Sequence, residues 1–192
     1  MRATAKSAPG RKSKLVCITG LPGAGKSTAA DFFVAKGYQY LRFGQINLDI
    51  IKQRGLVPNE KNESKIREEI REKHGMAAMA ILNISKFKQL LKKGGVLGDG
   101  LYSYQEYEIL RKEFGNALIV IAIFAPPKLR HKRLSERKTR PLTKAQAESR
   151  DIHELINLNK GPTIAMADHT VLNTKDKQYL LDQLRNLSIP GL

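Results

Sequence analysis

The sequence predicts an α/β protein built on a parallel sheet that is flanked by helices. Short apolar runs alternate with longer stretches of helical periodicity, which is the pattern of strands joined by crossover helices. Residues 118–124, Leu-Ile-Val-Ile-Ala-Ile-Phe, are continuously apolar, as in a strand buried on both faces. A glycine-rich turn directly follows the first apolar run and precedes a helical pattern. The interior of the sheet is therefore expected near residue 120.

The elements can be placed along the chain from their local signals. Strands are expected at residues 15–19, 38–42, 95–98, 117–124 and 170–172. Two capping boxes mark helix starts, Ser103 with Glu106 and Thr143 with Gln146, because in each the side chain and the backbone satisfy free hydrogen-bonding groups. Residues 76–91 space their apolar side chains for packing one helix face on the core.

Length and composition are those of a soluble globular chain. With 192 residues, 41% of them hydrophobic, the chain is long enough for one sizeable core and too apolar for wholesale disorder. No run approaches the roughly 18 apolar residues of a membrane span, and no apolar segment of a secretory signal is present. The single cysteine, Cys17, lies in an apolar run where burial is expected. We therefore expect a cytoplasmic protein with no membrane partner.

The charge of the chain favours anionic partners. Its 34 Lys and Arg against 18 Asp and Glu give a net charge of +16. Residues 1–14 carry five basic residues, no acid and no periodicity, so a flexible basic tail is expected there. Residues 15–192 are expected to form a single domain, and they keep 29 basic against 18 acidic residues, a net +11. Nucleotides, coenzymes and nucleic acids all fit that charge.

A phosphate-binding loop is the most specific motif. Residues 20–27, Gly-Leu-Pro-Gly-Ala-Gly-Lys-Ser, match G-x-x-x-x-G-K-[ST] between a strand and a helical pattern. Glycines suit the loop because its backbone N–H groups turn inward around a phosphate, at a helix N-terminus whose dipole favours anions. A dinucleotide-binding turn is the alternative, but the third glycine of G-x-G-x-x-G is missing. The expected nucleotide-binding residues are Gly20, Gly23, Ala24, Gly25, Lys26, Ser27 and Thr28.

Two side chains of this loop have distinct expected roles. Lys26 is expected to reach the β and γ phosphates of a triphosphate, and its presence favours a triphosphate ligand. Ser27 is expected to give its hydroxyl group to Mg²⁺, the ion that bridges those phosphates. The loop alone does not say whether the γ-phosphate goes to water, to a small molecule or nowhere.

Further segments give the chain a family resemblance. It has the loop, then Asp99-Gly100, then a basic segment at 130–140, then Ala-Asp-His-Thr-Val-Leu-Asn at 167–173. In this order they resemble the nucleotide-kinase group of P-loop proteins over residues 15–187, and among these dephospho-CoA kinases and adenylate-kinase-like proteins. The resemblance implies a P-loop NTPase fold with a five-stranded parallel sheet, and ATP and Mg²⁺ as cofactors.

The same resemblance assigns roles along the chain. A helical acceptor segment is implied at about 43–92, and an Arg-rich lid that closes over ATP at about 130–150. Asp99 is implied to hold Mg²⁺ or to take the proton of an acceptor hydroxyl group, with a turn residue as the alternative. Asn173 is implied to lie where the following loop packs on adenine, with a strand-ending turn as the alternative.

Arginines of the lid are candidates for the phosphoryl group in transfer, whose growing negative charge an arginine can neutralise. Arg137 and Arg140 are favoured because they lie nearest the turn before Pro141, and a solvated helix face is the alternative. Arg150 either contacts phosphate or forms one half of a surface ion pair.

The acceptor side departs from the resemblance. Many nucleotide kinases carry an arginine just after this Asp-Gly, where the present chain has Leu-Tyr-Ser-Tyr at 101–104. Tyr102 or Tyr104 could stack on a base or donate a hydrogen bond, or simply pack. Arg42 and Gln45 are the other candidates on the acceptor side.

Together these features predict a small-molecule kinase that uses ATP and Mg²⁺ on a nucleotide-like or coenzyme-like acceptor, dephospho-CoA or a nucleoside monophosphate. Lys26, Asp99, Arg137 and Arg140 are the predicted catalytic residues, and Ser27 and Asp99 the predicted metal ligands. The alternative is a P-loop ATPase whose basic surface engages nucleic acid, although only 6% of residues are aromatic and available for base stacking. A third reading is a binding module without turnover.

Overall fold

The computed structural model describes residues 13–189, and a five-stranded sheet forms their centre. The strands are β1 (Leu15–Thr19), β2 (Gln39–Arg42), β3 (Val96–Asp99), β4 (Leu118–Phe124) and β5 (His169–Leu172). Their order is β2-β3-β1-β4-β5, and every neighbouring pair is parallel. The predicted five-stranded parallel sheet is confirmed, with each strand within one residue of its expected bounds. Residues 1–12 of the predicted tail lie outside the described residues.

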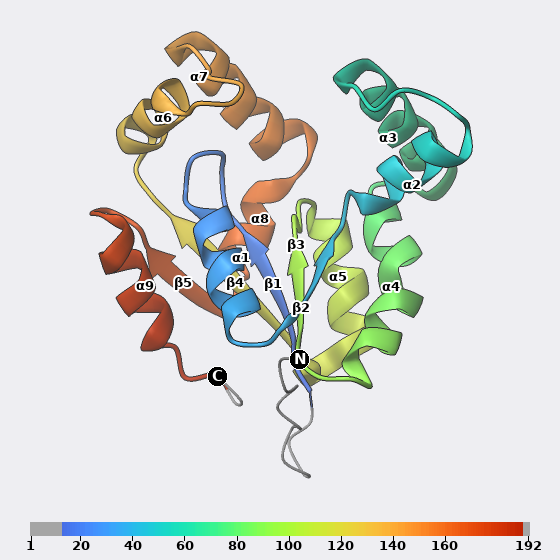
Figure 1. Ribbon diagram of the computed structural model, residues 1–192, viewed down its shortest axis with the longest axis horizontal. Coiled ribbons are helices and arrows are strands. Elements are labelled where there is room, and N and C mark those ends of the chain that lie inside the picture. The colour runs from blue at the N-terminus through green and yellow to red at the C-terminus, as the bar shows by residue number, and fades with distance from the viewer. Residues whose placement is uncertain (1–12, 190–192) are drawn as a thin grey trace, which may run out of the picture.

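Helices connect the strands and cover both faces of the sheet (Figure 1). They are α1 (Lys26–Ala35), α2 (Gln45–Gln53), α3 (Glu60–His74), α4 (Ala78–Leu91), α5 (Tyr104–Phe114), α6 (Pro127–Glu136), α7 (Lys144–Ile152), α8 (Lys160–Ala165) and α9 (Lys177–Arg185). A short 3₁₀ helix, η1 (Gly115–Ala117), precedes β4, and a π-helical segment, η2 (His153–Asn157), follows α7. Both predicted capping boxes are present, at the starts of α5 and α7.

The central strand β1 shows how two cores form on the two faces of the sheet. Leu15 and Cys17 belong to a cluster with Phe87 of α4 and Leu110 of α5. The alternate residues of β1, Val16 and Ile18, belong to a second cluster with side chains of α1 and α9. This follows from the two-residue period of a strand, which sends successive side chains to opposite faces. Burial of Cys17 is confirmed, and it raises the pKa of the thiol.

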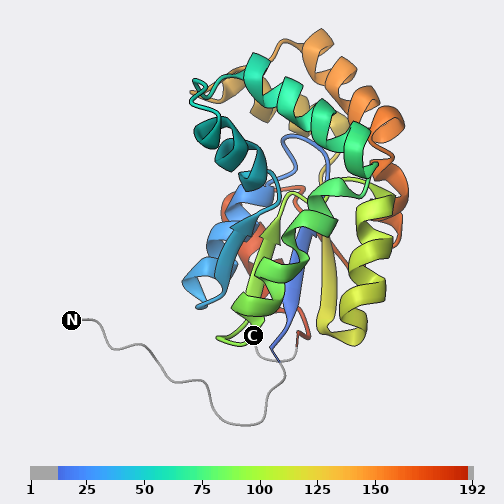
Figure 2. The same cartoon turned by 90° about the vertical axis from the view of Figure 1, so that its right-hand side faces the viewer.

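The carboxyl ends of the strands all lie at one edge, because the strands are parallel. The loop after β1 is at that edge, and two helical arms rise on either side of it, α2 with α3 and α6 with α7 (Figure 1). Figure 2, turned by 90°, shows both arms at the same end of the sheet. In open parallel sheets this edge is where ligands bind. Among residues 13–189, no helix is long and apolar enough to cross a membrane.

The core on the α4 side can be tested at Phe87, which is fully buried against Phe43 and Phe114. We expect Phe87→Ala to lower the free energy of unfolding by about 3–5 kcal/mol, because it removes buried ring contacts and leaves a cavity. Phe124→Ala is the matched control, since that ring is 46% exposed. Urea unfolding followed by circular dichroism measures both, and an equal loss in the two variants would contradict the assignment of Phe87 to the core.

Candidate nucleotide-binding site

The loop between β1 and α1 has the backbone of a phosphate cradle. Gly20, Gly23 and Gly25 have φ angles of 133°, 77° and 104°, a region that residues with a side chain rarely adopt. A Cβ atom at Gly20 would lie 2.4 Å from the carbonyl oxygen of Ile123. A Cβ atom at Gly23 would lie 2.6 Å from that of Arg130. Glycine is therefore required at these positions for conformation and for space.

Lys26 begins α1, directly after Gly25. Its Nζ atom donates a hydrogen bond to the carbonyl oxygen of Leu21 at 3.0 Å, within the same loop. Burial and, to a smaller extent, the charge of Lys160 lower the pKa of Lys26 to about 7, against the opposing charges of Glu154 and Asp99. The lysine is thus held among charged groups at the edge of the sheet.

The start of α1 is open to an anion. Gly25 is the residue before the helix and provides no side-chain cap for the first-turn N–H groups. Ser27 is exposed and Thr28 is half-buried in that first turn. Ala24, in contrast, is buried, and its carbonyl oxygen is held by a residue from the far end of the chain.

That residue is Asn173, which directly follows β5. Its Nδ2 atom donates to the carbonyl oxygen of Ala24 at 2.7 Å, and its backbone N–H donates to Phe124 at 2.7 Å. Asn173, a predicted nucleotide-binding residue, therefore does contact the phosphate-binding loop. Arg133 of α6 in turn donates to the carbonyl oxygens of Asn173 and Lys175, at 3.2 and 2.9 Å. The contacts of Asn173 bear on loop geometry, and its role toward adenine stays a prediction.

A second brace on the loop, Arg130 of α6, was not distinguished by the sequence. Its guanidinium group donates to the carbonyl oxygens of Pro22 and Ala125, at 3.1 and 3.0 Å. It also binds Asp151 of α7 through two hydrogen bonds of 2.8 and 2.7 Å. His131 contacts the same carboxylate at 2.9 Å. This buried cluster joins the lid helices to the phosphate-binding loop, and Arg130 was hidden in the sequence among five other basic residues of 130–140.

On the acceptor side, Asp99 ends β3 and lies beside β2. The Tyr40 hydroxyl group donates to Asp99 Oδ2 at 2.7 Å. Burial, together with this hydrogen bond to a carboxylate, raises the pKa of Tyr40. Arg42 is opposite Asp99 in the strand register, whereas Gln45 donates to Asp49 within α2 at 2.9 Å. Asp99 is also opposite Ile18 of β1 in the strand register, so it lies at the edge of the sheet where the phosphate-binding loop begins.

A buried pair of charges, Glu154 and Lys160, adjoins this site and was not predicted from the sequence, although their neighbours Arg150 and Tyr102 were candidates. The Lys160 ammonium group is 4.1 Å from the ring centroid of Tyr102, in the loop after β3. It donates to Glu154 Oε2 at 2.7 Å, and Arg150 Nε donates to Glu154 Oε1 at 3.3 Å. Tyr102 thus packs under an ammonium group, while Tyr104 stacks on Tyr107 with a centroid distance of 5.8 Å. Lone lysine and glutamate residues in a polar stretch carry no motif, which is why they were missed.

The two favoured lid arginines lie apart from these contacts. Arg137 donates through Nε to the carbonyl oxygen of Arg140, in the loop that joins α6 to α7. Arg140 is exposed and has a positive φ of 51°. The catalytic role of Arg137 and Arg140 stays a prediction.

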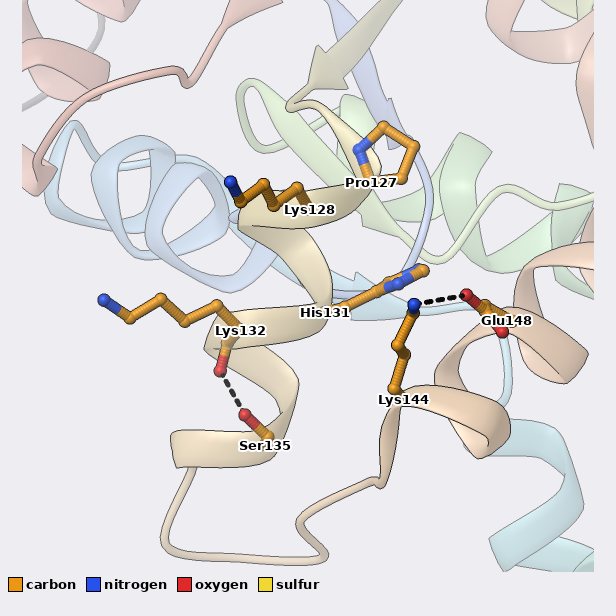
Figure 3. Close-up of a pocket in the computed structure, with 7 residues that line it drawn as sticks. All are labelled: Pro127, Lys128, His131, Lys132, Ser135, Lys144 and Glu148. Carbon is orange, nitrogen blue, oxygen red and sulfur yellow. Dashed lines mark hydrogen bonds and ion pairs between the residues drawn. The ribbon is translucent and has the colours of Figure 1, made fainter.

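A hollow of about 550 Å³ lies between α6 and α7 (Figure 3). Its lining residues are Pro127, Lys128, His131, Lys132, Ser135, Lys144 and Glu148. Figure 3 shows Lys144 paired with Glu148 next to the His131 ring. No residue of the loop at 20–27 lines it, so the hollow belongs to the lid and not to the phosphate-binding loop.

The fold and the loop define the class of this protein as a P-loop kinase-like, nucleotide-binding domain. A family model described as an AAA domain matches residues 19–151. The chain belongs to the UPF0200 family, since it is 33% identical over 177 residues to a UPF0200 protein of Thermococcus gammatolerans. That match covers 90% of this chain and 93% of the relative.

Solved structures share the fold at low sequence identity. The crystal structure of TT1252 from Thermus thermophilus matches with a TM-score of 0.61 and 15% identity, over 90% of this chain and 94% of that one. A gluconokinase from Sinorhizobium meliloti 1021 matches with a TM-score of 0.55 and 13% identity, over 93% and 95% of the two chains. These matches establish a P-loop kinase fold for the chain.

The brace of Arg130 and Asp151 predicts a pH dependence of stability. Burial alone would raise the pKa of Asp151, but hydrogen bonds from Arg130 and His131 outweigh it and hold the pKa below its usual value. A carboxylate with a lowered folded pKa stabilises the protein above its unfolded pKa, and this contribution is lost as pH falls through the folded value. We expect Asp151→Asn to cost about 3 kcal/mol at pH 7, because Arg130 stays buried without its anion.

Urea unfolding at pH 7 and at about pH 3 measures this difference. The difference in unfolding free energy between wild type and Asp151→Asn is expected to narrow at the lower pH, because Asp151 of the unfolded wild-type chain takes up a proton there. Asp182→Asn is the control, because Asp182 forms an exposed ion pair with Arg185 within α9. A gap that is the same at both pH values would refute the lowered pKa of Asp151.

Proposed function

We propose that the protein is an ATP- and Mg²⁺-dependent kinase that phosphorylates a small nucleotide-like or coenzyme-like acceptor, such as dephospho-CoA or a nucleoside monophosphate. The observation that carries the proposal is that Asp99 ends β3 opposite Ile18 of β1, at the same edge of the sheet where the loop with Lys26 follows β1. A phosphate-binding lysine and a carboxylate on the neighbouring strand are what transfer from a triphosphate to a hydroxyl or phosphate group requires.

The residues present fit a nucleotide triphosphate. The glycines of the loop leave a cradle that Cβ atoms would close, and the uncapped start of α1 provides N–H groups and a positive dipole end. Lys26 would exchange its bond to the Leu21 carbonyl oxygen for a bond to phosphate. The N–H groups at the start of α1 and the Lys26 ammonium group would therefore donate hydrogen bonds to the β and γ phosphates.

The residues also fit Mg²⁺, which is usually bound by one or two protein oxygens together with substrate phosphates. Ser27 has an exposed hydroxyl group, and Asp99 keeps Oδ1 available because Tyr40 occupies Oδ2. Among residues 13–189 no group of three or more His, Cys, Asp or Glu side chains forms a protein-only metal cage. When bound, the ion would offset the charge of the β and γ phosphates.

The chain's own groups then have the following parts in the proposed reaction. Lys26 and the loop N–H groups hold the phosphates, and Asn173 and Arg130 keep the loop in place through Ala24 and Pro22. Asp99 Oδ1 would either hold Mg²⁺ or, for a hydroxyl acceptor and with the ion held by Ser27 and the phosphates, take the proton of that hydroxyl group. Arg137 and Arg140 would reach the transferring group only by movement of the lid, which would also exclude water.

The experiment that tests the proposal is ADP formation from ATP and Mg²⁺, first alone and then with nucleoside monophosphates, deoxynucleotides and dephospho-CoA. The proposal predicts that one acceptor stimulates turnover and gains 80 Da, about the mass of one phosphoryl group, as mass spectrometry would show. If no acceptor helps and RNA or DNA stimulates hydrolysis instead, the P-loop ATPase reading replaces the kinase.

Lys26→Ala should abolish this turnover, by about 10²-fold or more, and weaken ATP binding, because it removes a preorganised charge at the phosphates. The fold should change little, since Lys26 bonds only within its own loop among the described residues. Lys36→Ala is the control, because Lys36 is exposed at the end of the same helix. Turnover equal in the Lys26 and Lys36 variants would refute the nucleotide site.

Asp99→Asn should keep ATP affinity within about threefold and lose turnover by about 10²-fold or more, because an amide can neither take the proton nor balance a cation. The amide can still accept the Tyr40 hydrogen bond, so stability should hold. Steady-state kinetics and nucleotide titration separate the two quantities. Full activity in Asp99→Asn would make Asp99 a turn residue only.

A further inference from the structure

The burial of charged and apolar side chains is inverted at the end of α7 and in the segment that follows it. Glu154 and Lys160 are buried, with 4% and 1% of their surface exposed, whereas Ile152 and Ile156 are 62% and 73% exposed. Burying two charges costs free energy, and such pairs rarely stabilise a fold more than apolar residues of equal size would. Sequences break their local rules mainly at functional sites.

The backbone explains how the inversion is built. Residues His153–Asn157 form a π-helix, a rare conformation that is frequent at functional sites. Asn159 then adopts a positive φ of 49°, and α8 begins with Lys160. The wider turn of the π-helix and the positive φ of Asn159 bring the two side chains together, with Lys160 Nζ 2.7 Å from Glu154 Oε2. The Tyr102 ring covers the ammonium group at 4.1 Å.

The two oxygens of Glu154 serve different cations. Oε2 accepts from the buried Lys160, and Oε1 accepts from Nε of Arg150 at 3.3 Å. Lys160 thus orients the Glu154 carboxylate, and the carboxylate binds Arg150 at its Nε atom. Arg150 is 47% exposed, and its contact with Glu154 is made through Nε, which leaves its two terminal amino groups for a ligand.

Arg150 is also close to the phosphate-binding loop. Its charge, like that of Lys160, lowers the pKa of Lys26, while the charge of Glu154 raises it. The same charges of Arg150 and Glu154 act on Tyr102, in the loop after β3. The contacts of the neighbouring residue place Arg150 there as well: Asp151 binds Arg130, and Arg130 donates to the carbonyl oxygen of Pro22 in the loop. Arg150 therefore lies at the end of α7 that is joined to the phosphate-binding loop.

We propose that Glu154 and Lys160 are positioning residues, which hold Arg150 beside the phosphate-binding loop so that its terminal amino groups bind the phosphoryl group during transfer. The inference rests on the proposed function, because it deepens the account of the same site. A fixed arginine costs less ordering in the transition state than a mobile one, which is how a positioning pair contributes to rate.

The test uses the full chain and needs no acceptor. Binding of a fluorescent N-methylanthraniloyl ADP with Mg²⁺ is titrated without and with aluminium fluoride, which mimics the phosphoryl group in transfer. We expect wild type to bind more tightly with fluoride present. Arg150→Ala and Glu154→Gln should each lose about tenfold or more of that gain, the range for a charge-assisted hydrogen bond, and keep the affinity for the ADP analogue alone.

A double-mutant cycle separates positioning from a structural role. If Glu154 acts through Arg150, adding Glu154→Gln to Arg150→Ala lowers the gain no further. Glu148→Gln and Lys144→Met are matched controls, because they alter an exposed pair on the same helix, and they should keep the full gain. The proposal would be overturned if Arg150→Ala and Glu154→Gln reduced the fluoride gain additively. It would also be overturned if Glu154→Gln kept the full gain, as Glu148→Gln should. A wild type that gains nothing from fluoride would overturn it as well.

One variant guards against loss of folding. If Glu154→Gln leaves Lys160 buried without an anion and fails to fold, Glu154→Gln combined with Lys160→Met removes both buried charges at similar size. That double variant should fold and still lose the fluoride gain, because Arg150 is released. A retained gain would overturn the proposal. An intact, Glu154-dependent gain with no acceptor phosphorylated would refute the proposed acceptor chemistry and leave this inference standing.

Discussion

The geometry of the phosphate-binding loop is the constraint on which the rest of the site depends. Its glycines have positive φ angles. A Cβ atom added at Gly20 or Gly23 would lie only 2.4 or 2.6 Å from a backbone oxygen. Such a turn has few contacts of its own, so other elements must hold it. Arg130 binds the Pro22 carbonyl oxygen from the lid side, and Asn173 binds the Ala24 carbonyl oxygen from the strand β5 side. The loop is therefore fixed by residues 108 and 149 positions away in sequence.

This bracing connects the loop to the lid. From α6, Arg130 donates hydrogen bonds both to Pro22 of the loop and to Asp151 of α7. Arg133, also of α6, donates to the carbonyl oxygen of Lys175 after β5. A lid that moved as a whole would have to keep or exchange these buried bonds, since a buried guanidinium group without its carboxylate is costly. The parts of α6 and α7 that carry Arg130 and Asp151 are thus joined to the phosphate-binding loop, whereas Arg137 and Arg140 lie in the loop between the two helices.

The sequence predicted the sheet well and the site only in part, for physical reasons. Strand bounds follow from continuous apolar runs, and the loop follows from a motif whose spacing is dictated by phosphate geometry. Arg130 could not be separated from its basic neighbours, because a buried and a solvated arginine look alike in sequence. Glu154 and Lys160 were missed because periodicity assigns charge to the surface and isoleucine to the core, and the π-helix at 153–157 reverses that assignment.

The electrostatics of the site favour an anionic ligand between its cations. Burial lowers the pKa of Lys160, and burial and then the charge of Lys160 lower the pKa of Lys26. Glu154 offsets part of this repulsion but is already engaged by Lys160 and Arg150. A phosphate group at the loop would add the negative charge that these cations lack, and so would favour their charged forms. Asp99, which is half-buried and accepts a hydrogen bond from Tyr40, offsets only part of the positive charge around Lys26. The site therefore keeps a net attraction for a phosphate group.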